Sequence, residues 1–535
     1  MKDKIKKYFY PLMVVSILAI GIVLGSALQN RANAQQFRIG NFSLRLSKVD
    51  QMLQYMQNSY VDSLDVDSIT ELVMTDIVSK LDPHSSYIPK KDLELVNSQL
   101  EGSFSGIGVQ FSIQDDTVSV VAVISGGPSE GVGVLAGDKI IEVNDSAFTG
   151  KSITNERVIH TLRGPKGTEV KLGVIRGGTS EVLHFTVVRG DIPVHSVDAA
   201  FIAAPTIGYV RVNKFGDTTY DEFINALNKL KVEGAKSYIV DLRENSGGYM
   251  DKAIKMSNEF LQAGDMIVYA KGRAYPTYEA RANGLGRFQK ARLIVLIDDF
   301  SASASEIFAG AMQDNDRATI IGRRSFGKGL VQQQIPFTDG SALRLTVARY
   351  YTPSGRCIQK PYELGKQEDY LNDLVERFEH GEMFSKDSVI QTDTTKYFTK
   401  SGRIVYGGGG IMPDIFVGRD TTLFTPWYNR VVNHAYTYQF AYQYTDRHRR
   451  QLTEIKDWHT MEKYLKKAAW MEQFVGFCKD KGVEPNREQI EKSRPLVERL
   501  INAYIIRNIL GDDAFFEIYE RDDEMMKMAI EELNK

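Results

Sequence analysis

The sequence predicts a multidomain α/β protein with helical regions near both ends. Its 535 residues correspond to three or four domains at roughly 150 residues each. From about Ile207 onwards, apolar strand-like runs alternate with helical patterns, which is typical of an α/β core. A β-rich stretch with many glycines precedes this core, and a helical stretch containing all three tryptophans follows residue 420.

Residues 1–34 have the pattern of a signal-anchor or a signal peptide. A lysine-rich start leads into an apolar segment, residues 8–28, which is long enough as a helix to cross about 30 Å of hydrocarbon. The lysines keep the N-terminus in the cytoplasm. We therefore expect the protein to work outside the cytoplasm, anchored to the membrane by residues 8–28. Cleavage after Ala34 is the alternative, because residues 32–34 (ANA) have the small-x-small pattern of a signal peptidase site.

The next two segments differ in their periodicity. In residues 35–101 the apolar side chains recur at helical spacing, which predicts an N-terminal helical region. These helices would bury little surface on their own, so a homodimer contact is a hypothesis for them. In residues 102–190 glycine-rich turns separate β-rich runs, with one helical pattern at residues 154–162. This segment is interpreted as a compact β domain.

The α/β core is expected to be interrupted. Residues 191–362 and 407–420 contain the alternating pattern, including strands at residues 238–242 (YIVDL) and 293–297 (LIVLI). Residues 363–406 are polar and charged, and we interpret them as an insertion. Residues 421–535 form a helical C-terminal region that is expected to have a core of its own.

Composition excludes several classes of function. Lys and Arg number 66 against 68 Asp and Glu, so the net charge of −2 gives no basic surface for nucleic acid. The two cysteines, Cys357 and Cys478, fit either one bridge or two free thiols, and they cannot form a zinc cluster on their own. We expect neither a metal site nor a cofactor.

Two serine patterns in the chain are weak candidates for a nucleophile. Residues 127–131 (GPSEG) spell a nucleophile elbow, but the residues that follow are too rich in glycine to begin a helix, so a turn is the better interpretation. Residues 325–328 (SFGK) spell the Ser-x-x-Lys pair of penicillin-binding enzymes. Glycines flank the lysine, which makes the helix that this pair requires doubtful.

A third pattern, residues 301–306 (SASASE), lies where a buried strand ends and a helix over about residues 303–313 begins. A helix N-terminus offers unpaired N–H groups that suit an oxyanion. Helix capping is the alternative, because Glu306 lies at capping-box spacing from Ser303.

Geometry brings a lysine to this third serine pattern. The helix leads about 16 Å away at 1.5 Å per residue, and the following strand returns about 20 Å at 3.3 Å per residue. Lys328 therefore lies beside Ser303 in space. No histidine falls near these motifs, so lysine is the candidate general base.

Several strings, in order along the chain, resemble the carboxy-terminal processing peptidases, which are serine endopeptidases with a Ser/Lys dyad. They are residues 241–248 (DLRENSGG), 301–306 (SASASE) and 326–332 (FGKGLVQ). The resemblance implies a PDZ domain at residues 102–190, inserted in a catalytic core related to the ClpP/crotonase folds. It also implies protein substrates that are bound by their C-terminal region.

Carried over by position, the resemblance implies that Ser303 is the nucleophile, Lys328 the general base and Gln332 the residue that orients the lysine. The amides of Ala304 and of either Gly247 or Gly248 would form the oxyanion hole. Ser246 stands where the family has a proline. An ordinary lysine pKa near 10.4 must fall by roughly 3 units for Lys328 to act as a base, so its side chain must be buried.

In the PDZ-like segment, a glycine-rich loop resembles the carboxylate-binding loop of the family. Its residues are Gly106, Ile107, Gly108 and Val109. A tight β-turn is the alternative. Arg163 is a candidate link between this domain and the catalytic core, or else a solvated residue of a turn. His84 is interpreted as a structural contact of its turn, not as a catalyst.

Two other functions are left open by the residues alone. One is a catalytically silent PDZ scaffold on the same fold. The other is a penicillin-binding-type acyl transferase that uses Ser325 and Lys328.

Overall fold

The computed structural model describes residues 36–39, 42–45, 47–98, 100–114, 116–124, 126–135, 137–176, 181–391 and 393–535. The predicted anchor at residues 8–28 and the cleavage motif at 32–34 lie outside these residues. Within the described ranges, no helix is both long and apolar enough to cross a membrane. The chain divides into two compact units, residues 1–78 and residues 79–535.

The first unit contains a short hairpin and two helices. Strands β1 (Gln36–Ile39) and β2 (Phe42–Arg45) pair in antiparallel fashion, and α2 (Lys48–Ser59) and α3 (Val66–Ser79) follow. Ser47 and Asp50 begin α2 with a capping box. No residue of α2 is buried, and the apolar side chains of Met52 and Tyr55 are exposed.

The β domain is a sheet with strand order β10-β9-β7-β6-β5. Its strands are β5 (Val109–Gln114), β6 (Thr117–Val123), β7 (Lys139–Val143), β9 (Glu169–Ile175) and β10 (Val182–Val188), and β8 (Ser146–Ala147) pairs with β7. The helix expected over residues 154–162 is α6 (Asn155–Leu162). The turn expected at residues 127–131 is wrong, because α5 (Pro128–Val132) begins there with a proline in its first turn.

Short elements on both sides join this domain to the rest of the second unit. Strand β3 (Ser86–Ile88) and helix α4 (Lys90–Ser98) come before it in the chain. Strand β4 (Ser103–Gly106) pairs with β11 (Gly190–Pro193), so the entry and the exit of the domain lie side by side. The domain therefore projects from the core on a two-stranded stem.

The α/β core is built on a six-stranded sheet of order β12-β13-β14-β17-β18-β23. Strands β13 (Ile207–Val212), β14 (Ser237–Asp241), β17 (Arg292–Ile297) and β18 (Thr319–Gly322) are parallel to one another, and β12 (Val197–Ala204) runs antiparallel at the edge. Strand β23 (Ile415–Phe416), which follows the insertion, closes the other edge in parallel. Helices α7 (Thr219–Val232), α8 (Met250–Asn258) and α9 (Ala304–Asp314) pack with one face of the sheet around a large apolar core.

A second sheet of order β16-β15-β20-β19 lies beside the first. Its strands are β15 (Met266–Lys271), β16 (Tyr278–Arg281), β19 (Leu330–Pro336) and β20 (Ala342–Tyr351), and β3 pairs with β20. Residues 363–406, the expected insertion, contain α10 (Gln367–Glu379), a 3₁₀ turn (Lys386–Ser388) and the two-residue strands β21 (Tyr397–Phe398) and β22 (Ile404–Val405).

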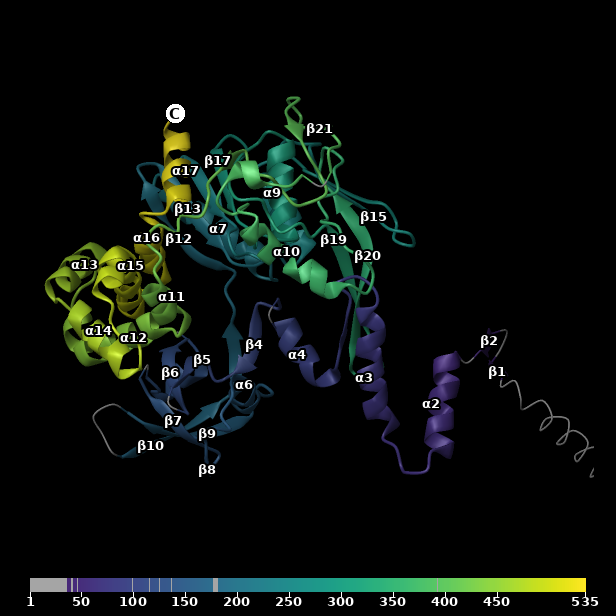
Figure 1. The fold of residues 1–535 in the computed structure, drawn as a ribbon, viewed down its shortest axis with the longest axis horizontal. Coiled ribbons are helices and arrows are strands. Elements are labelled where there is room, and N and C mark those ends of the chain that lie inside the picture. The colour runs from purple at the N-terminus through teal and green to yellow at the C-terminus, as the bar shows by residue number, and fades with distance from the viewer. Residues whose placement is uncertain are drawn as a thin grey trace, which may run out of the picture. The chain divides into compact units, whose positions relative to one another are not determined.

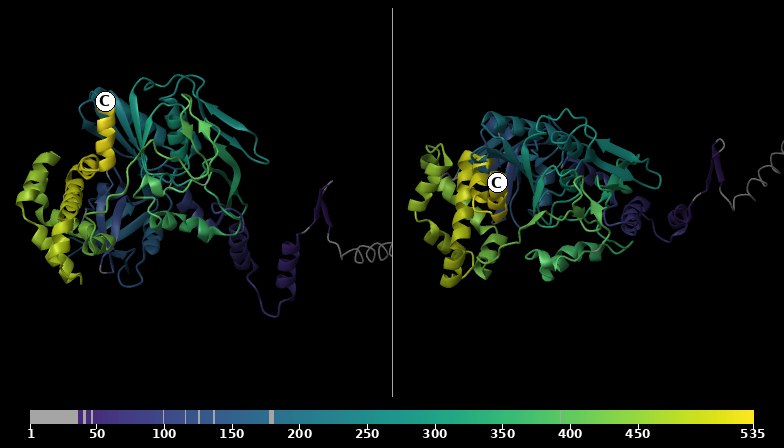
Figure 2. Two further views of the ribbon diagram at one scale, coloured as in Figure 1. Left: turned by 45° about the horizontal axis from the view of Figure 1, so that its top comes forward. Right: turned by 90° about the horizontal axis from the view of Figure 1, so that it is seen from above.

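The C-terminal region has two parts. Helices α11 (Pro426–Asn433), α12 (Tyr436–Leu452), α13 (Trp458–Lys467), α14 (Met471–Asp480) and α15 (Arg487–Leu510) enclose an apolar core that contains Trp427 and Trp470. Helix α16 (Asp512–Glu520) still packs in this core through Ala514, Phe515 and Ile518, and α17 (Glu524–Asn534) then leaves the bundle. Met525, Met526 and Ala529 of α17 pack on the sheet face opposite α7–α9. Figures 1 and 2 show α17, in yellow, against the sheet. The end of the chain is therefore part of the α/β core. Both cysteines are free thiols.

Candidate active site

Ser303 lies at the carboxyl end of β17, where the chain turns into α9. Its backbone has φ 57° and ψ −112°, a conformation that costs a non-glycine residue of the order of 1–3 kcal/mol and that persists only where the surroundings impose it. Gly247 provides the space, because a Cβ atom there would lie 2.7 Å from the Ser303 Cβ and 2.9 Å from the Ala304 nitrogen. The loop of residues 241–248 and the start of α9 are therefore in direct contact.

The three serines of residues 301–306 differ in burial and in hydrogen bonding. The Ser301 and Ser305 side chains are fully buried, and each hydroxyl donates to a backbone carbonyl, that of Leu242 and that of Asn245 respectively. Ser303 is partly exposed. It is the one member of the run that can meet a substrate.

A buried carboxylate, that of Glu306, holds both halves of the site. It accepts hydrogen bonds from the Ser303 amide at 2.7 Å, the Gly327 amide at 2.8 Å and the Lys328 amide at 2.9 Å. The Ser325 hydroxyl donates to it as well, at 2.5 Å. Burial raises the pKa of Glu306. Sequence reasoning treated this residue only as a helix cap and missed its contacts with residues 325–328.

Lys328 is oriented through its side chain and its backbone. Its Nζ donates to Gln332 Oε1 at 3.1 Å, and Gln332 Nε2 donates to the His84 carbonyl oxygen. The Tyr350 hydroxyl lies 3.0 Å from the carbonyl oxygen of Ser303 and 2.5 Å from that of Lys328, so it bridges the two segments. Sequence reasoning did not single out Tyr350.

The electrostatic setting favours a neutral lysine. Burial, followed by the positive charge of Arg344, lowers the pKa of Lys328 from 10.5 to about 8. This is somewhat less than the lowering expected from the sequence, but it makes a substantial neutral fraction available near neutral pH.

His84 lies at the site as well as in its turn. The Asp82 carboxylate accepts the His84 and Ser85 amides, which fixes the turn. The His84 ring makes a 2.9 Å hydrogen bond with the Tyr370 hydroxyl of α10. Burial lowers the pKa of His84 to about 3, with a further contribution from Lys328, so the ring is neutral. Together with Lys328, Ser246 and other residues, His84 lines a hollow of about 490 Å³.

The amides beside Ser303 differ in their partners. The Gly247 amide donates to Asn245 Oδ1 at 2.9 Å. In the described part of the chain, neither the Gly248 amide nor the Ala304 amide donates a backbone hydrogen bond in a turn or loop. These two N–H groups are therefore available to an oxyanion, whereas that of Gly247 is not.

The glycine-rich loop of the β domain lines a second hollow, of about 360 Å³. The hollow is lined by the loop of Gly106, Ile107, Gly108 and Val109, and by side chains of β5 and α6. Among the described strands, β5 pairs only with β6, so its other edge is open to an extended peptide.

Arg163 is not a solvated residue of a turn. Its guanidinium lies 3.8 Å from the centre of the Phe104 ring, and Nη1 donates to Ser98 Oγ at 2.9 Å. Arg163 therefore ties the β domain to α4, the helix that leads into it.

Comparison with known proteins assigns the chain to a family. The sequence pattern of peptidase family S41 matches residues 206–371, that of the PDZ domain matches residues 105–187, and that of a family of unknown function, DUF8443, matches residues 427–511. The carboxy-terminal-processing protease of Bartonella bacilliformis is 37% identical over 320 residues, which are 59% of this chain and 73% of that protein. The carboxy-terminal processing protease CtpA of Bacillus subtilis is 32% identical over 369 residues, which are 67% of this chain and 76% of that protein.

The chain belongs to peptidase family S41. This S41 peptidase is a serine-type carboxy-terminal processing endopeptidase with a PDZ domain, on a multidomain α/β fold with a helical C-terminal region. Among solved structures, the photosystem II D1 C-terminal processing protease aligns over 70% of this chain and 88% of that chain, with 23% identity and a TM-score of 0.36. The peptide-bound PDZ domain of a carboxy-terminal protease from Vibrio cholerae aligns over 17% of this chain and 99% of that chain, with 29% identity and a TM-score of 0.16.

The other two serine patterns do not fit a nucleophile in this S41 peptidase. Ser325 is fully buried, and its hydroxyl donates to Glu306 while it accepts the Ile411 amide. Ser129 is also fully buried, in the first turn of α5. Neither hydroxyl can reach a substrate without rearrangement of the surrounding backbone.

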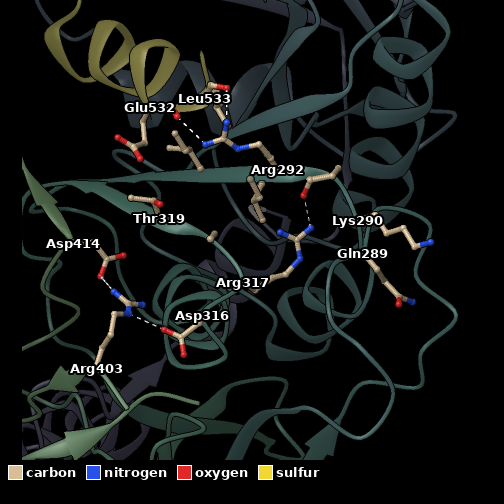
Figure 3. Close-up of a pocket in the computed structure, with 14 residues that line it drawn as sticks. Gln289, Lys290, Arg292, Asp316, Arg317, Thr319, Arg403, Asp414, Glu532 and Leu533 are labelled. Carbon is tan, nitrogen blue, oxygen red and sulfur yellow. Dashed lines mark hydrogen bonds and ion pairs between the residues drawn. The ribbon is translucent and has the colours of Figure 1, made fainter. Parts of the chain in front are cut away.

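A further hollow of the S41 peptidase lies at the opposite end of β17 and β18, where these strands begin. Figure 3 shows that its arginines already have partners. Arg292 donates to the carbonyl oxygens of Leu533 and Glu532. Arg317 donates to those of Phe288 and Ala291. Arg403 pairs with Asp316 and Asp414. These contacts join α17 and the insertion to the sheet, so we assign the hollow a structural role.

Proposed function

We propose that Ser303 and Lys328 form the catalytic dyad of this peptidase and that Gln332 is the residue that positions the lysine. The observation that carries the proposal is the shared set of anchors. Glu306 binds the amides of both Ser303 and Lys328, and Tyr350 bridges their carbonyl oxygens. Gln332 can only accept the Lys328 hydrogen bond through Oε1, because its amide nitrogen is directed at the His84 carbonyl.

The proposed reaction begins with neutral Lys328. Its Nζ takes the proton from Ser303 Oγ, which attacks the carbonyl carbon of the scissile peptide bond. The negative charge that develops on the carbonyl oxygen is stabilised by the Ala304 and Gly248 amides, at about 3 kcal/mol for each donor. The lysine ammonium then protonates the leaving amine, and the C–N bond breaks to give an acyl-enzyme on Ser303. A water molecule that is deprotonated by Lys328 hydrolyses this ester and restores both residues.

We propose further that the loop of residues 106–109 binds the terminal carboxylate of the substrate. Backbone amides of such a loop can hold a carboxylate while the peptide adds as a strand to β5. The open edge of β5 and the apolar lining of the groove support this assignment.

The sequence supports a proposal on location. We place the peptidase on the periplasmic side of the bacterial cell envelope, attached to the inner membrane by residues 8–28. N-terminal sequencing of the protein purified from membranes tests this. A chain that retains residues 8–28 supports the anchor, whereas a chain that begins at Gln35 and occurs free in the periplasm contradicts it.

The N-terminal helices support a proposal on assembly. The exposed apolar side chains of Met52, Tyr55 and Leu72 suit a contact with a second copy of the chain. Light scattering after size-exclusion chromatography is expected to give twice the monomer mass for the full chain and the monomer mass for a chain lacking residues 1–78. Equal oligomeric states in the two chains would contradict the proposal.

Cleavage of an unstructured protein by three chains tests the dyad. We expect the parent to cleave it, Ser303→Ala to be slower by roughly a thousandfold or more, and Ser325→Ala to retain cleavage to the extent that it folds. Retained cleavage in Ser303→Ala would overturn the proposal. Absence of cleavage in all three chains, the parent included, would favour the scaffold.

A further inference from the structure

Helix α12 of the C-terminal region packs directly on the PDZ domain. The Tyr442 side chain is 7% exposed, and its hydroxyl donates to the Val120 carbonyl oxygen of β6 at 2.9 Å. A Cβ atom at Gly137 would lie 3.0 Å from the Tyr442 hydroxyl oxygen and 3.2 Å from Asp446 Oδ1, so the loop before β7 is in close contact with the helix. Figure 1 shows α12 beside β5 and β6. The bundle is therefore placed next to the strand that offers its open edge to a peptide.

One turn before Tyr442 on the same face of α12, Tyr438 lines the peptide groove. It shares the hollow of about 360 Å³ with the loop of residues 106–109 and with Phe104, Phe111 and Leu162. Its ring packs edge-on against Tyr504 of α15, with 5.2 Å between the ring centres. The position of the Tyr438 ring is therefore set by packing within the bundle, although the ring lines a groove of the PDZ domain.

The chemistry of the groove defines what it can select. Most of its lining side chains are apolar, and the two polar ones are Gln110 and Arg163. The Arg163 guanidinium is already engaged by the Phe104 ring and the Ser98 hydroxyl. Burial raises the pKa of the Tyr438 hydroxyl, which therefore stays neutral. A rigid aromatic ring in such a place favours an apolar side chain, because an apolar contact excludes water without leaving a polar group unpaired.

We propose that the helical bundle of residues 427–511, the segment that matches a family of unknown function, forms part of the substrate groove, and that Tyr438 is a specificity-determining residue. It selects peptides that carry an apolar side chain within the last few residues before a free carboxylate. This inference rests on the proposed function of the loop of residues 106–109. Truncating a residue of this kind typically weakens binding by about tenfold.

The test uses fluorescent peptides and the full chain with Ser303→Ala, so that the peptides are not consumed. Dissociation constants are measured by anisotropy for peptides that end in leucine, in glutamate and in a leucine amide. In the parent background, we expect the free-carboxylate leucine peptide to bind most tightly. Tyr438→Ala is expected to weaken its binding about tenfold. Tyr436→Ala is the matched control, because Tyr436 lies on the same helix and contacts His434 and Phe477 within the bundle. It is expected to leave the constant unchanged within twofold.

A second variant distinguishes a specific loss of affinity from a loss of folding. Tyr438→Lys places a positive charge on the same wall, and we expect it to bind the glutamate peptide at least fivefold more tightly than the parent does, a gain that an unfolded protein cannot produce. Equal affinities of the parent, Tyr438→Ala and Tyr438→Lys for each peptide would overturn the inference while leaving carboxylate recognition intact. Equal binding of the leucine acid and the leucine amide by the parent would overturn the proposed role of the loop, and this inference with it.

Discussion

The backbone amide of Ser303 donates a 2.7 Å hydrogen bond to the buried carboxylate of Glu306. The same carboxylate binds the amides of Gly327 and Lys328. One anion therefore fixes the distance between the segment that carries the proposed nucleophile and the segment that carries the proposed base. Since it touches neither substrate nor reacting atoms, Glu306 is a positioning residue.

Replacing Glu306 with glutamine tests this positioning role. The amide has one acceptor oxygen where the carboxylate has two, so it cannot accept all four donors, and each lost hydrogen bond to a charged group costs about 1.5–3 kcal/mol. We expect kcat to fall between about tenfold and a hundredfold, with KM changed little and the melting temperature lowered by several degrees.

The control for Glu306→Gln is Glu259→Gln. Glu259 is also buried, and it binds the Tyr220 hydroxyl and the Arg287 amide far along the chain from the site. The Glu259→Gln variant is expected to have a lower melting temperature than the parent and an unchanged kcat. A parental kcat in Glu306→Gln would show that the shared carboxylate is not needed to place the dyad.

The pKa of Lys328 sets the pH dependence of the reaction. Burial lowers this pKa to about 8, and the base is the neutral form, so activity rises with pH and levels off above about 8. At pH 7 roughly one tenth of the lysine is neutral. The measurement is kcat/KM for a peptide substrate between pH 6 and pH 10. A rate that stays constant from pH 6 to pH 9 would exclude Lys328 as the titrating base.

Gln332→Glu tests whether Gln332 acts through the lysine. The new carboxylate would lie where an amide oxygen now accepts from Lys328 Nζ at 3.1 Å. An adjacent negative charge favours the ammonium form and raises its pKa by about 1 unit or more. We expect activity at pH 7 to fall about tenfold and to recover as the pH is raised.

The comparison variant at this position is Gln332→Ala, which removes the hydrogen bond without adding a charge. It is expected to reduce kcat at every pH and to leave the shape of the pH profile unchanged. Superimposable profiles for the glutamate and alanine variants would contradict a direct interaction between Gln332 and the lysine.

The sequence was most informative where chemistry lies in short strings. The run of residues 301–306 and Lys328 could be singled out because strand, helix and returning strand bring them together by simple geometry. Gln332 was indicated only by the resemblance to the carboxy-terminal processing peptidases. The choice between Gly247 and Gly248 depends on which amide Asn245 engages, a contact set by the loop conformation that no spacing reveals. The hydrogen bonds of Glu306 to residues 325–328 were not predicted, because a glutamate three residues after a serine is also explained by helix capping alone.

Other contacts could not be predicted from the sequence, for a different reason. Tyr350, Tyr370 and Tyr438 each act on residues that lie far away in sequence, and a lone tyrosine in a strand or a helix carries no pattern. The same holds for α17, whose apolar face could equally have packed within the C-terminal bundle. Only the tertiary structure shows that it covers the central sheet.

The packing of α17 predicts a stability effect at a distance from the site. Met526 is buried against the sheet face that includes Tyr209 and Ile239. Met526→Ala is expected to destabilise the catalytic core by about 2–4 kcal/mol, because it leaves a cavity. Lys527→Ala, at an exposed position of the same helix, is expected to change stability by less than about 0.5 kcal/mol. The stability of both variants is measured by urea unfolding, with loss of peptidase activity as the probe. Equal midpoints for the two variants would contradict the assignment of α17 to the core.

The central claim is that catalysis proceeds through an ester on Ser303, and trapping that ester tests it most directly. The full chain is mixed with a p-nitrophenyl ester of a short peptide, quenched in acid and analysed by intact mass and peptide mapping. We predict a mass increase equal to one acyl group in the parent, located on the peptide that contains Ser303 and absent from Ser303→Ala. An acyl group on Ser325 or Ser129, or the same mass increase in Ser303→Ala, would contradict it.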